Sequence, residues 1–130
     1  MITNLAAIIL INKKRKILFQ LRDDKPTISY PNHWTLLGGH IEKGEKPAEA
    51  VKREVLEEIE YKIENPLFMG VFTDSYKNKI YVYKSQIDKK INELVLHEGQ
   101  KINYFSFNEI PSLKMPDSLR SFLINNKEFF

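Results

Sequence analysis

Residues 47–59 carry the pattern of an amphipathic helix, and this segment constrains the fold more than any other. Apolar residues recur there every three or four positions and would form one core-facing stripe: Ala48, Val51, Val55 and Ile59. Pro47 suits the first helical turn, because its missing N–H loses no hydrogen bond there. A helix with one apolar face must cover another layer, and strands on either side of it in the sequence can supply that layer.

The segments around this helix carry strand and turn patterns. β-Branched and apolar residues predict strands over residues 5–11 and 17–22, joined by a turn at 12–15. Residues 23–33 contain two prolines and predict a loop. Further extended segments are expected at residues 34–37, 63–74, 79–85, 94–97 and 103–107. Asp117 fits the N-cap of a last helix over residues 118–125, so the whole pattern predicts a mixed α/β (α+β) sandwich.

Length and composition exclude several classes of protein. A chain of 130 residues fits a single domain, residues 1–130, and the absence of cysteine excludes disulfides and a thiol nucleophile. The longest apolar run, residues 5–11, is too short to span a bilayer, and the start lacks the basic region of a secretory signal. We therefore expect a soluble cytoplasmic protein. Net charge is only +3, and we interpret the basic residues 13–16 as a solvated turn rather than a phosphate patch.

The predicted helix also has an acidic side. At about 100° per residue, Glu54, Glu57 and Glu58 fall within an arc of about 100° opposite most of the apolar stripe. Neighbouring like charges repel, whereas a divalent cation would be bound by these hard oxygen ligands. Arg53 could hold a glutamate through a fork-shaped hydrogen bond. The alternative is a solvated acidic face, which is common on helices.

The spacing of these residues favours the metal site. Residues 39–61 resemble the Nudix box, G-x5-E-x7-R-E-U-x-E-E-x-G-U, in which U is a bulky apolar residue. The chain fills every required position but one, beginning at Gly39 and including Glu45. The exception is Glu60, which stands where the family has glycine. Glycine would serve a left-handed C-cap, so glutamate there should cost about 1 kcal/mol.

The resemblance implies a Nudix-type α/β/α sandwich with a mixed β-sheet and a catalytic loop–helix motif. It also implies a Mg²⁺ site, with Mn²⁺ as a substitute. The predicted metal ligands are the carbonyl of Gly38 and the carboxylates of Glu54, Glu57 and Glu58. Glu45 would lie behind these ligands or form an outer metal contact, and Arg53 would orient the glutamates.

Three further segments look similar to parts of MutT-type enzymes. Glu98-Gly99-Gln100 resembles their Glu-Gly-Gln loop, which makes Glu98 a candidate metal ligand and the alternative to Glu54 as the general base. Arg22 lies where a phosphate-contacting arginine is found, although it could instead pair with a neighbouring aspartate. Asp117 lies near the position where these enzymes place a residue that contacts the base. It could instead be the N-cap of the last helix. Gly39 is the remaining predicted substrate contact.

These resemblances predict a Mg²⁺-dependent hydrolase that cleaves a diphosphate linkage in a nucleoside diphosphate compound. The leading substrate is a nucleoside triphosphate, including an oxidised purine nucleotide, cleaved to the monophosphate and pyrophosphate. The alternatives are a nucleotide-sugar or dinucleoside-polyphosphate hydrolase and, from another class, a non-catalytic Nudix-fold nucleotide-binding module. An RNA-end hydrolase lacks support, because no basic platform interleaved with aromatic residues is visible. The expected partner is a small nucleotide, with no membrane or nucleic acid, and the oligomeric state stays open between monomer and homodimer.

Overall fold

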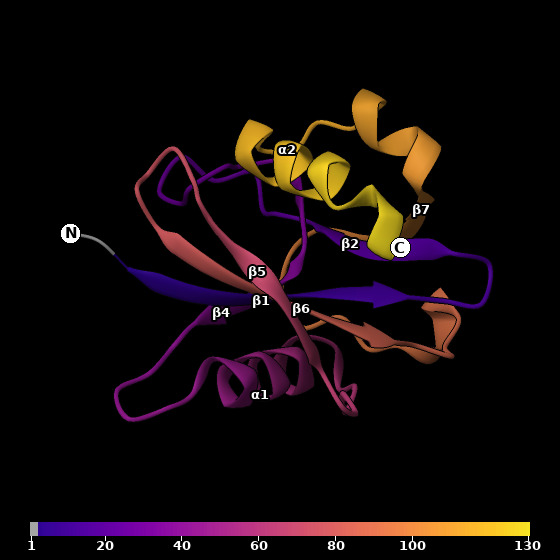
Figure 1. Ribbon diagram of the computed structural model, residues 1–130, viewed down its shortest axis with the longest axis horizontal. Helices are drawn as coiled ribbons and strands as arrows, with labels where there is room; N and C mark the ends of the chain where they lie inside the picture. The colour runs from indigo at the N-terminus through magenta and orange to yellow at the C-terminus, as the bar shows by residue number, and fades with distance from the viewer. Residues whose placement is uncertain (1–2) are drawn as a thin grey trace.

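The computed structural model describes residues 3–130 and places a mixed β-sheet between two helical layers (Figure 1). The strands are β1 (Asn4–Ile11), β2 (Lys16–Leu21), β3 (Trp34–Thr35), β4 (Leu37–His40), β5 (Leu67–Thr73), β6 (Lys79–Gln86) and β7 (Lys101–Ser106). The α-helices are α1 (Pro47–Ile59) and α2 (Asp117–Asn125), and the short 3-10 helices are η1 (Ile91–Glu93), η2 (Phe107–Ser112) and η3 (Lys127–Phe129). This arrangement confirms the predicted α/β/α sandwich.

Strand β1 is the central element of the sheet. It runs parallel to β6 from the pair Asn4–Lys79 to the pair Ile11–Gln86, and antiparallel to β4. The principal strand order is β3-β2-β1-β6-β5, with β4 pairing with β1 and β7 pairing with β2. Because β4 leads directly into the loop before α1, this pairing fixes the start of the acidic helix beside β1.

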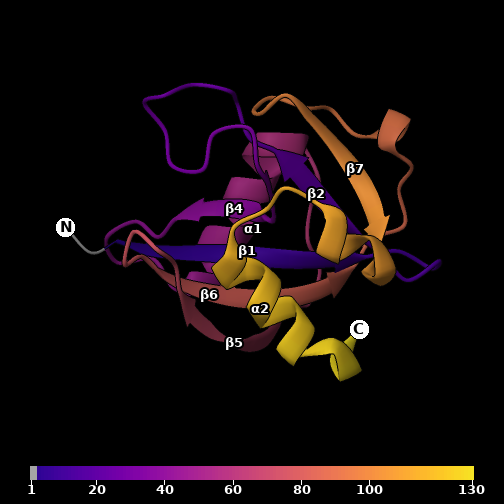
Figure 2. The same ribbon diagram turned by 90° about the horizontal axis from the view of Figure 1, so that it is seen from above.

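Helices α1 and α2 cover opposite faces of the sheet (Figures 1 and 2). Alternate residues of β1 enter different cores, since strand side chains point to opposite faces in turn. Ile8 and Leu10 pack in the cluster that includes the α1 stripe, whereas Ile9 packs in the cluster that includes Leu119 and Leu123 of α2. The longer helix, α1, has 13 residues. Among residues 3–130, no helix is long and apolar enough to cross a bilayer.

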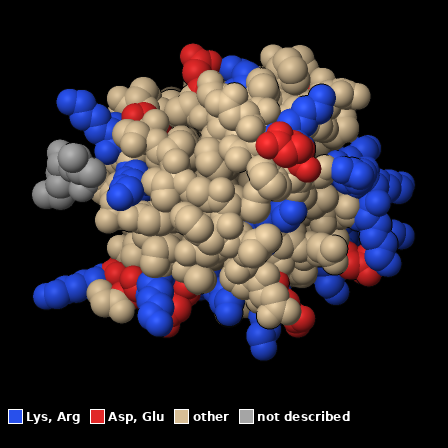
Figure 3. Space-filling model, viewed as in Figure 1, with Lys and Arg blue, Asp and Glu red and all other residues tan. Residues whose placement is uncertain are grey.

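The basic residues of the β1–β2 turn are exposed, as predicted for a solvated turn. Lys13, Lys14 and Arg15 all face solvent, and the space-filling view shows Lys and Arg gathered at the end of the molecule where this turn lies (Figure 3). The side-chain oxygen of Asn12 accepts hydrogen bonds from the N–H groups of Lys14 and Lys16 at 3.0 and 2.9 Å. Asn12 therefore closes the turn through hydrogen bonds made within it.

Three sequence predictions of local structure are wrong. The strand expected at 34–37 is two strands, because Trp34–Thr35 pairs with β2 and Leu37–His40 pairs with β1. Residues 94–97 form no strand. Their N–H groups instead meet the end of α1, where Val95 and His97 donate to helix carbonyls. Asp117 is not the cap of the last helix, since Pro116 occupies the N-cap position and Asp117 is the first helical residue.

Candidate active site

The paired glycines Gly38 and Gly39 lie on β4 at the centre of the candidate site. At Gly38 the backbone has a φ of +149°, and a Cβ atom there would lie 2.0 Å from the carbonyl oxygen of Ala6. At Gly39 a Cβ atom would lie 2.4 Å from the carboxyl carbon of Glu54. Only glycine therefore allows β4 to lie this close to β1 at position 38, whereas a side chain at position 39 would require the flexible Glu54 carboxylate to move.

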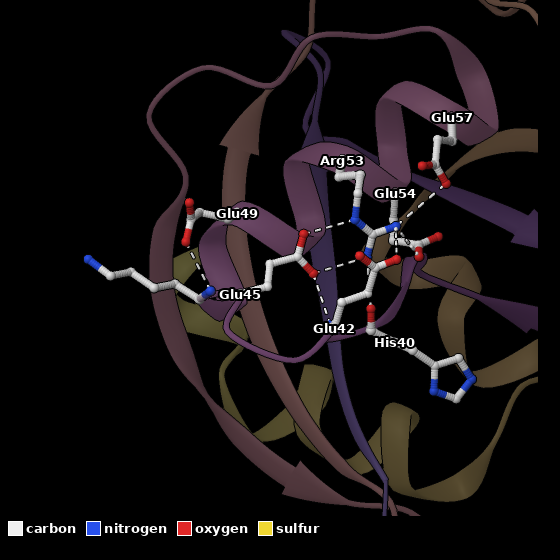
Figure 4. A network of polar contacts seen from close by, with 8 residues as sticks. His40, Glu42, Glu45, Glu49, Arg53, Glu54 and Glu57 are labelled. Atoms are coloured by element: carbon white, nitrogen blue, oxygen red, sulfur yellow. Dashed lines mark hydrogen bonds and ion pairs between the residues drawn. The ribbon is translucent and has the colours of Figure 1, made fainter.

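Arg53 connects the loop before α1 to the acidic side of the helix (Figure 4). Its Nε and Nη2 atoms donate to the two carboxylate oxygens of Glu45 at 2.8 and 3.1 Å, which is the expected fork-shaped contact. Nη2 also donates to the carbonyl of His40 at 3.0 Å. Nη1 donates to Glu54 at 2.8 Å and lies 3.6 Å from a carboxylate oxygen of Glu57. One guanidinium group thus orients the glutamates of both loop and helix.

These contacts favour the charged forms of the groups they join. The hydrogen bond to Glu45 raises the pKa of Arg53. The same bond, helped by one from the Glu42 N–H, holds the pKa of the Glu45 carboxyl below its usual value. Arg53 and Glu45 therefore form a charged pair next to the carboxylates that lie farther along α1.

The three carboxylates of the acidic side differ in burial. The Glu57 side chain is 61% exposed and the Glu54 side chain 17% exposed, whereas Glu58 is only 3% exposed. The N–H of Gly38 donates to Glu58 Oε1 at 3.2 Å. A solvated acidic face, the alternative considered from the sequence, does not describe this arrangement, because Glu58 is packed between α1 and β4.

Burial strongly favours the neutral form of Glu58 in the absence of a cation. Desolvation, together with the nearby charges of Glu98 and Glu54, raises the pKa of Glu58 to about 8, against the opposing effect of the hydrogen bond from Gly38. Burial also raises the pKa of Glu54, while the hydrogen bond from Arg53 opposes that rise. Perturbed carboxyl groups that lie close together in a cleft are typical of functional sites.

Glu98 reaches the same site from a separate segment, the Glu-Gly-Gln loop. Its carbonyl accepts a hydrogen bond from Gln20 Nε2 at 2.6 Å. Gly99 has a φ of +87°, and a Cβ atom there would lie 2.7 Å from the same Gln20 nitrogen and 2.9 Å from the Leu21 carbonyl oxygen. The N–H of Gln100 donates to that Leu21 carbonyl at 2.8 Å. Gly99 and Gln100 thus anchor the loop on β2 and leave the Glu98 carboxylate beside α1.

The donor set fits a divalent cation. Glu98 raises the pKa of both Glu54 and Glu58 through its charge, so the three carboxylates crowd one region. Mg²⁺ and Mn²⁺ prefer carboxylate and carbonyl oxygens, and a bound cation would remove the repulsion between them. Within residues 3–130 no three such side chains are already gathered in metal-binding geometry. Arg53 draws Glu54 and Glu57 toward itself, so these two would have to turn to share a cation.

A cavity of about 280 Å³ adjoins these carboxylates. One part of its wall is polar and contains Glu54, Glu98 and the paired glycines. Arg22 lies in the same wall, and its Nε atom donates to the carbonyl of Ser29 at 2.8 Å rather than pairing with a neighbouring aspartate. An arginine and several carboxylates around one space can hold a phosphate chain together with a cation.

The other part of the cavity is mainly apolar and lies toward α2. Its wall includes Leu36, Phe72, Ile80, Pro116 and Leu119. Ser118 also lines it, and its hydroxyl oxygen is buried with no hydrogen-bond partner in the described part of the chain. A buried hydroxyl normally has a partner, so this hydroxyl is an exception among the described residues.

Asp117 lies outside this cavity. Its side chain is 98% exposed and forms an ion pair with Arg120 at 2.8 Å, so the structure does not bring it together with the other predicted site residues. The sequence reasoning missed Ser118 and Gln20. Ser118 gives no signal, because serine is ordinary at the start of a helix, whereas Gln20 was detectable as a buried polar residue within the apolar β2 pattern.

The geometry of the paired glycines, Arg53 and the three helix carboxylates agrees with a comparison against protein families. The family model described as "NUDIX domain" matches residues 1–125. The chain belongs to the Nudix family. The left-handed conformation predicted at Glu60 from the family pattern is also present, with φ 54° and ψ 36°.

Two relatives in sequence cover only part of the chain. "Nucleoside triphosphatase NudI" of Escherichia coli is 33% identical over 66 residues, which are 50% of this chain and 45% of that protein. "Putative 8-oxo-dGTP diphosphatase" of Bacillus subtilis is 36% identical over 72 residues, 55% of this chain and 44% of that protein. The matched segment thus spans under half the length of these relatives.

Solved structures resemble the chain over nearly its whole length. A MutT protein from Methanosarcina mazei has a TM-score of 0.81 at 20% identity and covers 98% of this chain and 94% of its own. A MutT structure from the study of the Aliivibrio salmonicida and Vibrio cholerae proteins has a TM-score of 0.80 at 20% identity, with 100% of both chains covered. An Ap4A hydrolase from Caenorhabditis elegans has a TM-score of 0.73 at 20% identity, with 96% of both chains covered. At this level of identity the likeness establishes the fold.

Proposed function

We propose that this Nudix protein is a Mg²⁺-dependent hydrolase that cleaves a diphosphate linkage in a nucleoside diphosphate compound. The observation that carries the proposal is the convergence of Glu54, Glu58 and Glu98 beside the paired glycines at one end of a cavity. Three carboxylates crowded in a partly buried site repel one another when they are charged, and a bound cation would offset that repulsion. Mn²⁺ is expected to replace Mg²⁺, because both bind oxygen ligands.

The proposed ligands are the carboxylates of Glu54, Glu57 and Glu58 and the carbonyl of Gly38, and Glu98 is either a further ligand or the general base. A bound cation would neutralise phosphate oxygens and lower the pKa of a water molecule. Arg53 keeps the helix glutamates oriented, and Glu45 holds Arg53 in turn.

Glu98 is our preferred proton acceptor. Its carboxylate has no hydrogen-bond or ion-pair partner within residues 3–130, whereas Glu54 accepts a hydrogen bond from Arg53 at 2.8 Å. A carboxylate without a competing donor can accept a proton from water more readily than one already bound to a guanidinium group. Glu98 also sits on a loop anchored on both sides, which keeps its position defined.

The two ends of the cavity suggest how a nucleotide lies. The diphosphate would occupy the acidic end, contacted by Arg22 and the backbone at Gly39, and the base would occupy the apolar end with its polar edge toward Ser118. The leading substrate is a nucleoside triphosphate, including an oxidised purine nucleotide, cleaved to the monophosphate and pyrophosphate. The names of the two sequence relatives support this class. A base contact by Asp117 remains a prediction and would require its side chain to leave Arg120.

A dinucleoside polyphosphate is the second candidate substrate, and nucleotide sugars are a further alternative to be tested. One observation favours a dinucleoside polyphosphate. Tyr30 lines the cavity, and its ring packs edge-on against the exposed ring of Tyr76 at a centroid distance of 5.0 Å. This aromatic pair offers a stacking surface for a second base outside the cavity. An Ap4A hydrolase of known structure has the same fold, so dinucleoside polyphosphates are included among the substrates to be tested.

The test is a turnover assay with Mg²⁺ on a panel of ordinary and oxidised nucleoside triphosphates, nucleotide sugars and dinucleoside polyphosphates. We expect turnover of at least one triphosphate, and a fall of at least about a hundredfold in kcat for Glu58→Gln, because loss of a cation ligand removes charge neutralisation in the transition state. The control is Glu64→Gln, which replaces a glutamate outside the site. If the metal-loaded protein binds nucleotides but turns none of them over, the result would favour the non-catalytic binding module instead.

A further inference from the structure

The Nudix-box departure at Glu60 has a structural partner. Glu60 occupies the C-cap of α1 in the left-handed conformation, and its N–H donates to the Leu56 carbonyl at 3.0 Å. Glycine adopts this conformation without strain, whereas a side chain makes it unfavourable. The Glu60 carboxylate contacts Nε2 of His97, which lies 37 positions later in the chain. The residue that departs from the family pattern is thus bonded to the segment that leads into Glu98.

The backbone of this segment also binds the end of α1. The last carbonyl groups of a helix lack partners within the helix. His97 N–H donates to the Glu58 carbonyl at 2.8 Å, and Val95 N–H donates to the Ile59 carbonyl at 3.4 Å. Residues 95–97 therefore lie along the C-terminal end of the same helix whose carboxylates form the candidate metal site.

Glu98 is consequently fixed from two directions. On its C-terminal side, Gly99 and Gln100 anchor the loop on β2, and Gln20 binds the Glu98 carbonyl. On its N-terminal side, His97 is joined to α1 through its backbone and through the Glu60 side chain. The second direction joins the residue before Glu98 directly to α1, the helix that carries the other carboxylates.

We propose that the Glu60–His97 pair is a positioning device that holds Glu98 in register with the helix carboxylates of the reacting site. This inference rests on the proposed function, since it assigns a role relative to Glu98. Both side chains of the pair are about half exposed, and exposed ion pairs contribute little to stability. The unfavourable left-handed backbone at Glu60 further offsets any stabilisation of the fold by the Glu60–His97 contact. The pair therefore matters for the placement of Glu98 more than for the stability of the fold.

Glu60→Gly separates these two effects. The variant loses the contact with His97 while relieving the left-handed backbone, so its Tm should equal or exceed that of the wild type. We expect kcat for the best triphosphate to fall about three- to tenfold with KM within about twofold, because the loss concerns the reacting groups rather than substrate binding. His97→Ala should reproduce the fall in kcat, and the double variant should show no further loss.

The control for relief of strain is Arg15→Gly, which replaces an exposed residue with a φ of 61° in the distant β1–β2 turn. It should leave kcat unchanged. The decisive comparison places Glu60→Gly in a Glu98→Gln background that retains measurable turnover. If the pair acts through Glu98, Glu60→Gly causes no additional loss there.

The outcomes separate failure of this inference from failure of the proposed function. If Glu60→Gly keeps the wild-type kcat while Glu98→Gln is impaired, only the positioning role of the pair is overturned. An equal fractional loss in both backgrounds also overturns it, because the pair would then act elsewhere. Wild-type turnover in Glu98→Gln overturns the proposed role of Glu98 itself, and with it the role of the pair.

Discussion

Replacing Glu58 by glutamine should make the metal-free protein more stable while removing its proposed activity. Burial raises the pKa of this carboxyl to about 8, so a charge at this position is unfavourable when no cation is bound. Glutamine has nearly the same shape and keeps an oxygen that can accept the Gly38 N–H. At about 1.4 kcal/mol per pH unit, a rise from 4.5 to about 8 corresponds to at most about 5 kcal/mol of destabilisation by the charged form.

The pH dependence has a definite sign. Below pH 4.5 the Glu58 carboxyl is protonated in both the folded and the unfolded chain, and it contributes no penalty. Between pH 4.5 and about 8 the folded state binds more protons than the unfolded state, so the stability of the metal-free wild type falls as the pH rises. Above about pH 8 the full penalty is present. The stability advantage of Glu58→Gln should therefore grow across this window and then level off.

Urea unfolding in EDTA at several pH values between about 5 and about 9 measures this advantage directly. Glu57→Gln is the matched control on the same helix, because its side chain is 61% exposed and pays no comparable desolvation cost. Added Mg²⁺ should narrow the difference between wild type and Glu58→Gln, since the cation binds the folded wild type. A Glu58→Gln variant that is no more stable than the wild type at about pH 9, or an advantage that does not change with pH, would refute the reasoning.

Four further substitutions test other parts of the site. Gly39→Ala places a Cβ atom 2.4 Å from the Glu54 carboxyl carbon, so kcat should fall at least about tenfold while unfolding free energy changes by less than about 1 kcal/mol, because the carboxylate is the flexible end of its side chain. Arg53→Lys keeps the charge but loses the fork-shaped contact, and should lower urea stability by about 1–2 kcal/mol as well as kcat. Ser118→Ala removes a hydroxyl without a protein partner, so Tm should not fall, whereas KM for the preferred triphosphate should rise; an unchanged KM argues against the proposed base orientation. Asp117→Ala should change the free energy of unfolding by less than about 0.5 kcal/mol, since its ion pair is exposed, and a loss above about 1 kcal/mol would restore the discarded cap.

Features with a strong local pattern could be predicted from the sequence. The 3.6-residue period of α1 and the continuous apolar run of β1 both reflect burial against the core, and the observed bounds of β1, Asn4–Ile11, lie within a residue of the predicted 5–11. The left-handed conformation at Glu60 was predictable from the family pattern, which has a glycine at this position. The exposed turn at residues 13–15 followed from charge between two apolar strands.

Features that depend on contacts between distant segments could not be predicted. The burial of Glu58 requires β4 to pack against α1, and the helix period does not reveal that contact. The division of residues 34–40 into two strands depends on which partner strand each half meets. The cap at Pro116 displaced the one expected at Asp117, because the exposed aspartate turns to Arg120 instead of to the helix N–H groups. The contact between Glu60 and His97 joins positions 37 residues apart and has no local signal.

The central claim is that the carboxylates beside Gly38 and Gly39 support Mg²⁺-dependent cleavage of a diphosphate linkage. The most direct measurement is ³¹P NMR of a nucleoside triphosphate incubated with Mg²⁺ and either wild-type protein or Glu58→Gln. We predict nucleoside monophosphate and pyrophosphate with the wild type, and neither product with the variant or after chelation of the metal. Release of orthophosphate and nucleoside diphosphate, or equal pyrophosphate release by both proteins, would contradict the account.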